Sequence, residues 1–127
     1  MSKQTLQLLT ENFAIHSMDE TADIPTAVFK ANVFFIAKTP DELSIVCPST
    51  IHIDSFATES NWRALEVVGP LGFSLTGIMA NISGVLAKAN VSIFAISTYD
   101  TDYILVKQLQ VDDAIKALKK DGYHFLN

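Results

Sequence analysis

Cysteine, basic residues and long apolar runs are all scarce in this sequence, and each scarcity excludes a class of protein. The only cysteine among the 127 residues, Cys47, can form no disulfide within the chain, which suits a reducing compartment. No apolar run approaches the roughly 20 residues that a membrane-spanning helix needs. Residues 1–10 also lack the basic and then apolar order of a secretory signal. We therefore expect a cytoplasmic protein that does not cross a membrane.

Basic residues are outnumbered by acidic ones. The chain has 9 Lys and Arg against 14 Asp and Glu, for a formal net charge of −5, and its basic residues are scattered along the sequence. A nucleic-acid interface needs a stripe or patch of positive charge that neutralises phosphates. The sequence therefore predicts no binding to nucleic acid.

Side chains for catalysis or metal binding form no arrangement typical of either activity. His16, His52 and His124 share no ligand spacing with Cys47, so we predict neither a metal site nor a cofactor. No Ser/His/Asp, Cys/His or paired-carboxylate arrangement stands out. Residues 69–77 hold no arginine with which an acylphosphatase-type enzyme would bind a phosphate. We therefore expect a protein that is not an enzyme.

The strongest structural pattern lies between residues 71 and 106. Apolar residues recur there at the i, i+3, i+4, i+7 spacing of one helix face: Leu75, Ile78, Met79, Ile82, Val85, Leu86 and Ala89. The helix is expected to end at Asn90. Residues 91–98 then predict a strand, and the acidic turn at residues 100–102 leads into an antiparallel strand over residues 103–107.

The other elements complete a mixed α+β pattern. Residues 1–11 predict a lead-in strand or a loose arm, and residues 12–18 predict a weak strand. Further strands are expected at residues 33–37, 43–47, 62–69 and 123–126, with the first two paired as a hairpin, residues 48–60 as a connection and a helix near residues 111–118. From Trp62 onward the order is strand, helix, strand, strand, helix, strand, which is the βαββαβ order of a ferredoxin-like fold.

An internal repeat suggests two related units. FIAKTPDELSIV at residues 35–46 aligns with FAISTYDTDYILV at residues 94–106 if one residue is inserted in the turn. The chain is then two βαββαβ units in tandem, with antiparallel sheets that carry helices on one face. We expect a truncated first unit over residues 1–60, lacking its first helix, and a complete unit over residues 61–127.

The loop before the first long helix is the candidate binding element. A glycine loop that runs into a helix start offers unpaired backbone N–H groups and the positive end of the helix dipole, next to the acidic tip of the hairpin. Such a pair of features can receive a zwitterion. Gly77 also fits a close-packed helix glycine, Ser74 and Thr76 also fit N-caps, and Asp102 also fits an ordinary turn residue.

The run GPLGFSLTGIMANISGVLAKANVSIFAISTYDTDYILV resembles the ACT domain, a ligand-sensing module of enzymes of amino-acid metabolism. The segments PDELSIVCP and WRALEVVGPL are similar to small stand-alone tandem ACT proteins. The C-terminal half is more distantly similar to the mammalian cytosolic arginine sensors. The resemblance implies a regulatory protein that binds a small molecule, commonly an amino acid, at the interface between two ACT units.

The resemblance also implies which residues contact that ligand. From the loop and the helix start they are Gly72, Phe73, Ser74, Leu75, Thr76, Gly77 and Ile78. From the hairpin they are Thr98, Tyr99 and Asp102, the last at the place where the arginine sensors use an acidic residue. The facing unit is expected to offer Ser44, Ile45 and Val46.

One alternative stays open at this point. Edge strands of one chain can join those of another into a continuous sheet. The protein would then be an interaction or assembly module without a small ligand, and a homodimer is expected in that case.

Overall fold

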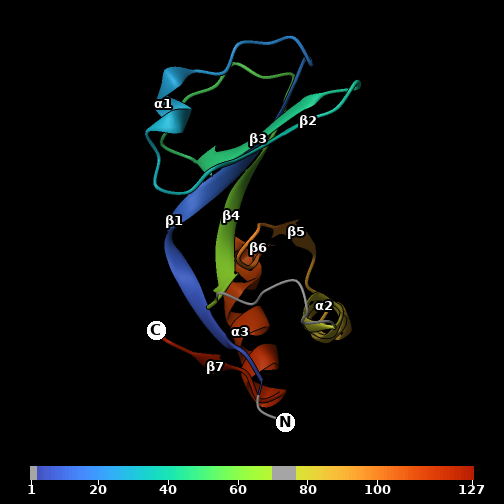
Figure 1. Ribbon diagram of the computed structural model, residues 1–127. Coiled ribbons are helices and arrows are strands. Elements are labelled where there is room, and N and C mark those ends of the chain that lie inside the picture. Colours follow the sequence, from blue (N-terminus) through green and yellow to red (C-terminus); the bar gives the residue numbers. More distant parts are fainter. Residues whose placement is uncertain (1–2, 70–76) are drawn as a thin grey trace. The chain divides into compact units, whose positions relative to one another are not determined.

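The computed structural model describes residues 3–69 and 77–127, which form a mixed α+β fold (Figure 1). The chain makes two compact units. Unit 1 comprises Met1–Thr10 and Arg63–Asn127, and unit 2 comprises Glu11–Trp62. None of the helices in the described ranges combines the length and the apolar character that a membrane crossing requires. The predicted α+β class is confirmed.

Unit 2 is built around a strand that has a neighbour on each side. β3 (Leu43–Pro48) pairs antiparallel with β2 (Phe35–Lys38) and with the second half of β1 (Thr5–Met18). The predicted hairpin of β2 and β3 is therefore confirmed. The buried core of this unit includes Met18, Val28, Leu43, Ile45, Cys47 and Ile53. Cys47 is a buried strand residue, and burial raises the pKa of its thiol.

Unit 2 also holds one short helix, α1 (Thr26–Phe29). The segment before this helix contains a turn, which is made by Asp19. Its Oδ1 accepts hydrogen bonds from the Thr21 amide at 2.9 Å and from the Thr21 hydroxyl at 2.6 Å. A carboxylate that binds the backbone two residues ahead favours a turn over a helix.

Unit 1 has the predicted βαββαβ order. It begins with β4 (Ala57–Val67), of which residues 63–67 belong to this unit. The chain then runs through α2 (Ile78–Lys88), β5 (Ile93–Ser97), β6 (Asp102–Lys107), a 3-10 turn η1 (Gln108–Gln110), α3 (Val111–Lys120) and β7 (His124–Phe125). β5 and β6 pair antiparallel, as expected, from Ile93 opposite Val106 to Ser97 opposite Asp102. α2 and α3 pack against each other. The two helices share a hydrophobic core with β4 and β6. Its buried residues include Leu65, Val67, Ile82, Leu86, Ile104, Val106, Val111, Ala114 and Leu118.

The α3 helix carries favourable charges at both of its ends. Asp112 and Asp113 lie in its first turn, and Lys119 and Lys120 lie in its last turn, where each charge opposes the local end of the helix dipole. Gly122 adopts a φ of +100°, a left-handed conformation that favours glycine just after a helix.

β4 begins earlier than predicted. The sequence predicts a connection over residues 48–60 and a strand only from Trp62, whereas the strand starts at Ala57. Residues 57–61 are all exposed, so they show none of the alternation of apolar and polar residues that identifies a half-buried strand. The predicted connection is therefore wrong over its last residues.

The N-terminal residues belong to the sheet of unit 1. β1 is one continuous strand of 14 residues, and its first residues pair parallel with β7, with Thr5 opposite His124 and Leu6 opposite Phe125. The Leu126 amide donates to the Leu6 carbonyl at 3.0 Å. On the other edge, the Val68 amide donates to the Thr5 carbonyl at 2.9 Å. Residues 5–10 are thus a strand rather than a loose arm.

Side chains strengthen this pairing. The Asn127 amide group accepts a hydrogen bond from the Leu8 N–H at 3.1 Å and donates one to the Leu8 carbonyl at 2.8 Å. Leu6 is fully buried in the core of unit 1. The division into a first ACT-like unit over residues 1–60 and an ACT domain over residues 61–127 stays a prediction.

We predict that Leu6→Ala destabilises unit 1 strongly. Removing a fully buried leucine side chain loses its transfer free energy and leaves a cavity, at a cost of about 2–5 kcal/mol. Leu109→Ala is the matched control, because Leu109 is 96% exposed and its loss should change the free energy of unfolding by less than about 0.5 kcal/mol. Urea unfolding followed by circular dichroism measures both. Equal costs for the two variants would contradict the buried position of β1.

Candidate functional site

The α2 helix begins directly after the glycine loop that was predicted to bind a ligand. Gly77 occupies the N-cap position with a φ of +78°, and its carbonyl accepts the first helical hydrogen bond, from the Asn81 amide at 2.9 Å. Among the described residues, apart from its chain neighbours and the backbone of its own helix, no atom lies within 4 Å of the point where a Cβ would stand. The left-handed backbone by itself favours glycine at this position. Ile78 follows it as a half-buried first residue of the helix.

The tip of the β5–β6 hairpin is closed by two threonines. The Thr98 amide donates to the Thr101 carbonyl at 2.8 Å, and the Thr101 amide donates to the Thr98 Oγ1 at 3.2 Å. The Thr101 hydroxyl is buried and donates to the Val67 carbonyl. This hydrogen bond fixes the hairpin tip against the end of β4. Nothing in the sequence distinguishes Thr101 from its polar neighbours.

A hollow of about 300 Å³ opens where the hairpin tip meets the end of β4. We call it the hairpin hollow, and its described lining is Glu66, Gly69, Thr98, Asp100, Thr101 and Tyr103. The Tyr103 hydroxyl donates to Glu66 Oε2 at 3.1 Å. Burial, this hydrogen bond and the negative charges of Glu66 and Asp100 raise the pKa of Tyr103 to about 12. The hollow is therefore a polar site with two carboxylates.

The three hairpin residues predicted to bind a ligand have different surroundings. Thr98 lines the hairpin hollow. Asp102 is half-buried, and one of its carboxylate oxygens accepts a hydrogen bond from the Ser97 hydroxyl on the paired strand. Tyr99 is 79% exposed. Glu66, Asp100 and Tyr103 were not predicted as site residues, and Asp100 was taken as a turn residue alone.

The remaining predicted contacts divide into two groups. Gly72, Phe73, Ser74, Leu75 and Thr76 lie outside the described residues. Ser44, Ile45 and Val46 lie on β3 in unit 2, where Ser44 is half-buried and the other two are buried. Ile45 belongs to the core of that unit. The predicted ligand site as a whole stays a prediction.

A metal site finds no support in the part of the chain that the structure describes. Within residues 3–69 and 77–127, no three His, Cys, Asp or Glu side chains are placed so that they could hold a metal ion together.

Two family models match this chain. The model described as the ACT domain matches residues 57–120. A model for an N-terminal domain matches residues 11–51, which lie within unit 2.

The chain is similar to curated mammalian proteins named cytosolic arginine sensor for mTORC1 subunit 1. The mouse protein is 33% identical over 103 residues, which cover 80% of this chain and 31% of that protein. The human protein is 38% identical over 74 residues, which cover 58% of this chain and 22% of that protein. The chain thus spans less than a third of the length of these relatives.

Solved structures share its fold over nearly its whole length. A crystal structure of a protein from Agrobacterium tumefaciens is 28% identical, with a TM-score of 0.89 over 99% of this chain and 94% of that chain. The ligand-free regulatory subunit of aspartate kinase from Thermus thermophilus is 10% identical, with a TM-score of 0.64 over 94% and 98% of the two chains, so its likeness concerns the fold alone. Because the ACT model covers residues 57–120, half of the sequence, this chain belongs to the ACT domain family.

Proposed function

We propose that this protein is a non-catalytic regulatory module that binds an amino acid. The observation that carries the proposal is the hairpin hollow, a polar site with two carboxylates within the segment that matches the ACT domain. The curated relatives are named as arginine sensors, which supports an amino acid as the ligand and the cytoplasm as the compartment. Regulatory subunits of aspartate kinase share the fold.

The chemistry of an amino acid matches the groups in unit 1. An α-ammonium group requires anionic acceptors, and the Glu66 and Asp100 carboxylates provide them at the hairpin hollow. An α-carboxylate requires N–H donors, and the first turn of α2 carries backbone amides that have no partner within the helix. In this proposal the ligand lies at an interface between ACT units, with Ser44, Ile45 and Val46 on the facing side.

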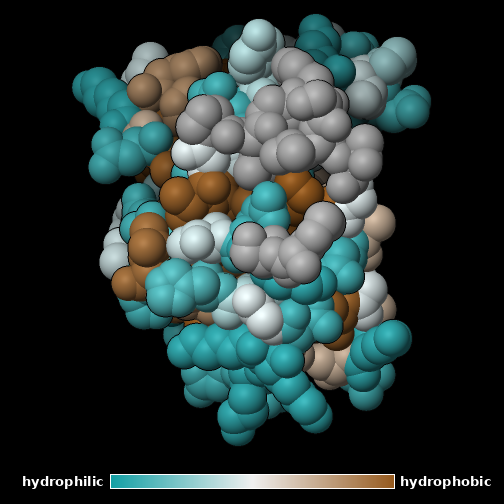
Figure 2. Space-filling model, turned by 60° about the horizontal axis from the view of Figure 1, so that its bottom comes forward, coloured by the Kyte–Doolittle hydropathy of each residue, from teal (hydrophilic) through white to brown (hydrophobic). Residues whose placement is uncertain are grey.

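The alternative of an assembly module has one observation in its favour. β5 lies at the end of the strand order β1–β4–β6–β5, with half-buried apolar side chains at Ile93, Phe94 and Ile96. Figure 2 shows hydrophobic patches between hydrophilic regions on one face of the molecule. Light scattering distinguishes the two proposals when it is combined with ligand measurements. A stable homodimer that responds to none of the amino acids would favour assembly.

The proposed function predicts that an amino acid binds to the folded protein. In a thermal-unfolding panel of the twenty amino acids at millimolar concentration, we expect at least one to raise the melting temperature. A ligand that binds only the folded state, at a concentration of about one hundred times its Kd, stabilises that state by about 2.7 kcal/mol. A panel without any shift would contradict the proposal.

The same assay locates the site. Glu66→Gln and Asp100→Asn are each expected to weaken binding of the active amino acid by about two- to tenfold, because each removes one charge from a partly exposed pair. Asp41→Asn is the matched control, since Asp41 lies in the exposed turn between β2 and β3. Equal weakening by Asp41→Asn would show that only net charge matters.

The surroundings of Tyr103 in the hairpin hollow predict that the stability of the protein depends on pH. The pKa of Tyr103 is about 12 in the folded chain, against 10 for an ordinary tyrosine, so the folded state holds this proton more tightly than the unfolded state. The resulting stabilisation is fully present below about pH 10 and is lost as the pH rises towards about 12. Tyr103→Phe removes it.

Urea unfolding across this pH range measures the effect. The difference in the free energy of unfolding between the wild type and Tyr103→Phe should shrink as the pH rises from about 10 to about 12. The control is Tyr99→Phe, because the Tyr99 side chain is 79% exposed. A wild-type advantage over Tyr103→Phe that stays constant with pH would contradict the proposed anionic surroundings.

A further inference from the structure

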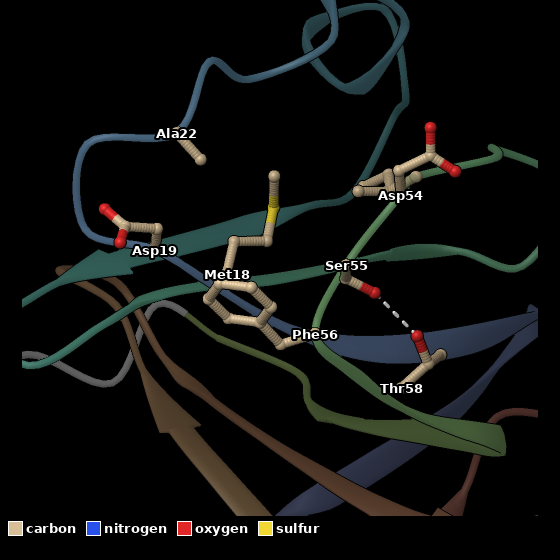
Figure 3. Close-up of a pocket in the computed structure, with 8 residues that line it drawn as sticks. Met18, Asp19, Ala22, Asp54, Ser55, Phe56 and Thr58 are labelled. Atoms are coloured by element: carbon tan, nitrogen blue, oxygen red, sulfur yellow. Dashed lines mark hydrogen bonds between the residues drawn. The ribbon is translucent and has the colours of Figure 1, made fainter.

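Unit 2 contains a second hollow, of about 470 Å³, between the end of β1 and the segment that leads into β4 (Figure 3). We call it the Phe56 hollow. Its lining consists of Met18, Asp19, Ala22, Ile53, Asp54, Ser55, Phe56 and Thr58. All of these residues belong to unit 2, so the hollow is distinct from the hairpin hollow of unit 1.

The lining combines an apolar surface with two carboxylates. Met18 and Ile53 are both 7% exposed and belong to the core of unit 2, whereas Phe56 is 80% exposed. In Figure 3, Asp19 and Asp54 stand on opposite sides, with the Met18 and Phe56 side chains between them. A ligand here would meet an aromatic ring, a thioether and two acidic groups.

The carboxylates are not neutralised by a Lys or Arg among the described lining residues. Hydrogen bonds from the Thr21 side chain and backbone hold the pKa of Asp19 below its usual value, so its carboxylate stays ionised. Asp54 Oδ1 lies 3.1 Å from His52 Nε2, and both side chains are largely exposed. The histidine adds positive charge only when it is protonated. The described lining of the hollow therefore carries two carboxylates and no Lys or Arg side chain.

The backbone that carries Phe56 is held in place. Its amide donates to the Ser17 carbonyl of β1 at 3.0 Å. The neighbouring hydroxyls of Ser55 and Thr58 lie 2.7 Å apart, and they lie 3.1 Å and 3.2 Å from Nδ1 of the buried His16. Burial, aided by the charge of His52, lowers the pKa of His16, so this imidazole does not offset the carboxylates. The exposed ring is thus set on a restrained backbone.

We propose that the Phe56 hollow binds a small organic cation, an alkylammonium compound. Its carbon chain would pack on Met18, Ile53 and Phe56, and its ammonium group would pair with Asp19 or Asp54. A cation near an aromatic face gains further attraction from the ring. Acidic groups on opposite sides favour a diamine over a monoamine, and the net charge of −5 attracts cations to the protein at low salt.

The test is an NMR titration of the full ¹⁵N-labelled chain with 1,5-diaminopentane at low salt. We expect shifts concentrated in residues 18–22 and 53–58. The comparison with 1-pentanol separates charge recognition from apolar contact, because the two probes share a five-carbon chain and pentanol has no charge. A parallel titration with Nα-acetyl-lysine N-methylamide asks whether the ammonium comes from a free amine or from a lysine side chain, and the tighter probe identifies the source.

Single substitutions test which residues of the Phe56 hollow bind the diamine. Asp19→Asn and Asp54→Asn are each expected to weaken diamine binding by about two- to fivefold, and Asn at position 19 keeps an oxygen acceptor for the Thr21 turn. Phe56→Leu keeps an exposed apolar side chain but loses the ring, and a similar loss is expected. Asp41→Asn is the control outside the hollow.

Three outcomes would overturn the proposal. The first is a 1-pentanol titration that shifts the same residues as strongly as the diamine does. The second is equal weakening by Asp41→Asn and Asp54→Asn, which would indicate non-specific charge attraction. The third is the absence of diamine shifts at residues 18–22 and 53–58. None of these results depends on whether unit 1 binds an amino acid.

Discussion

The pairing of residues 5–6 with residues 124–125 is the constraint on which the sheet of unit 1 depends. Through it the first strand of the chain lies between β7 and β4, and Leu6 becomes part of the core that α2 and α3 cover. Hydrogen bonds from the Leu126 and Val68 amides satisfy both edges of this short segment. Without it, β7 would lose its described neighbour in the sheet.

Most of the regular elements could be predicted from the sequence. The α2 helix followed from its apolar spacing, and a helix was expected near residues 111–118, where α3 lies. The two hairpins followed from short apolar strands around acidic turns. In each case the sequence pattern that identifies the element spans no more than about 15 residues, so it can be read without knowing any distant partner.

The features that the sequence did not show depend on distant partners. Residues 5–10 have no regular alternation, and their neighbours in the sheet, β4 and β7, lie far along the chain, so the choice between a strand and a loose arm could not be made locally. The hairpin hollow also depends on residues that are distant from one another in the sequence. Glu66 resembles an ordinary surface carboxylate in the sequence and becomes part of a site only because β4 ends beside the hairpin tip.

The distance along the chain between paired residues has a consequence for how unit 1 folds. Leu8 bonds to Asn127, which lies 119 positions later in the sequence. In the sequence, residues 11–62 of unit 2 stand between the two parts of unit 1. Pairing β1 with β7 therefore requires the chain to close a loop of more than one hundred residues. Such long-range closure is slow, because the entropy of closing the loop has to be overcome before the contacts stabilise the sheet.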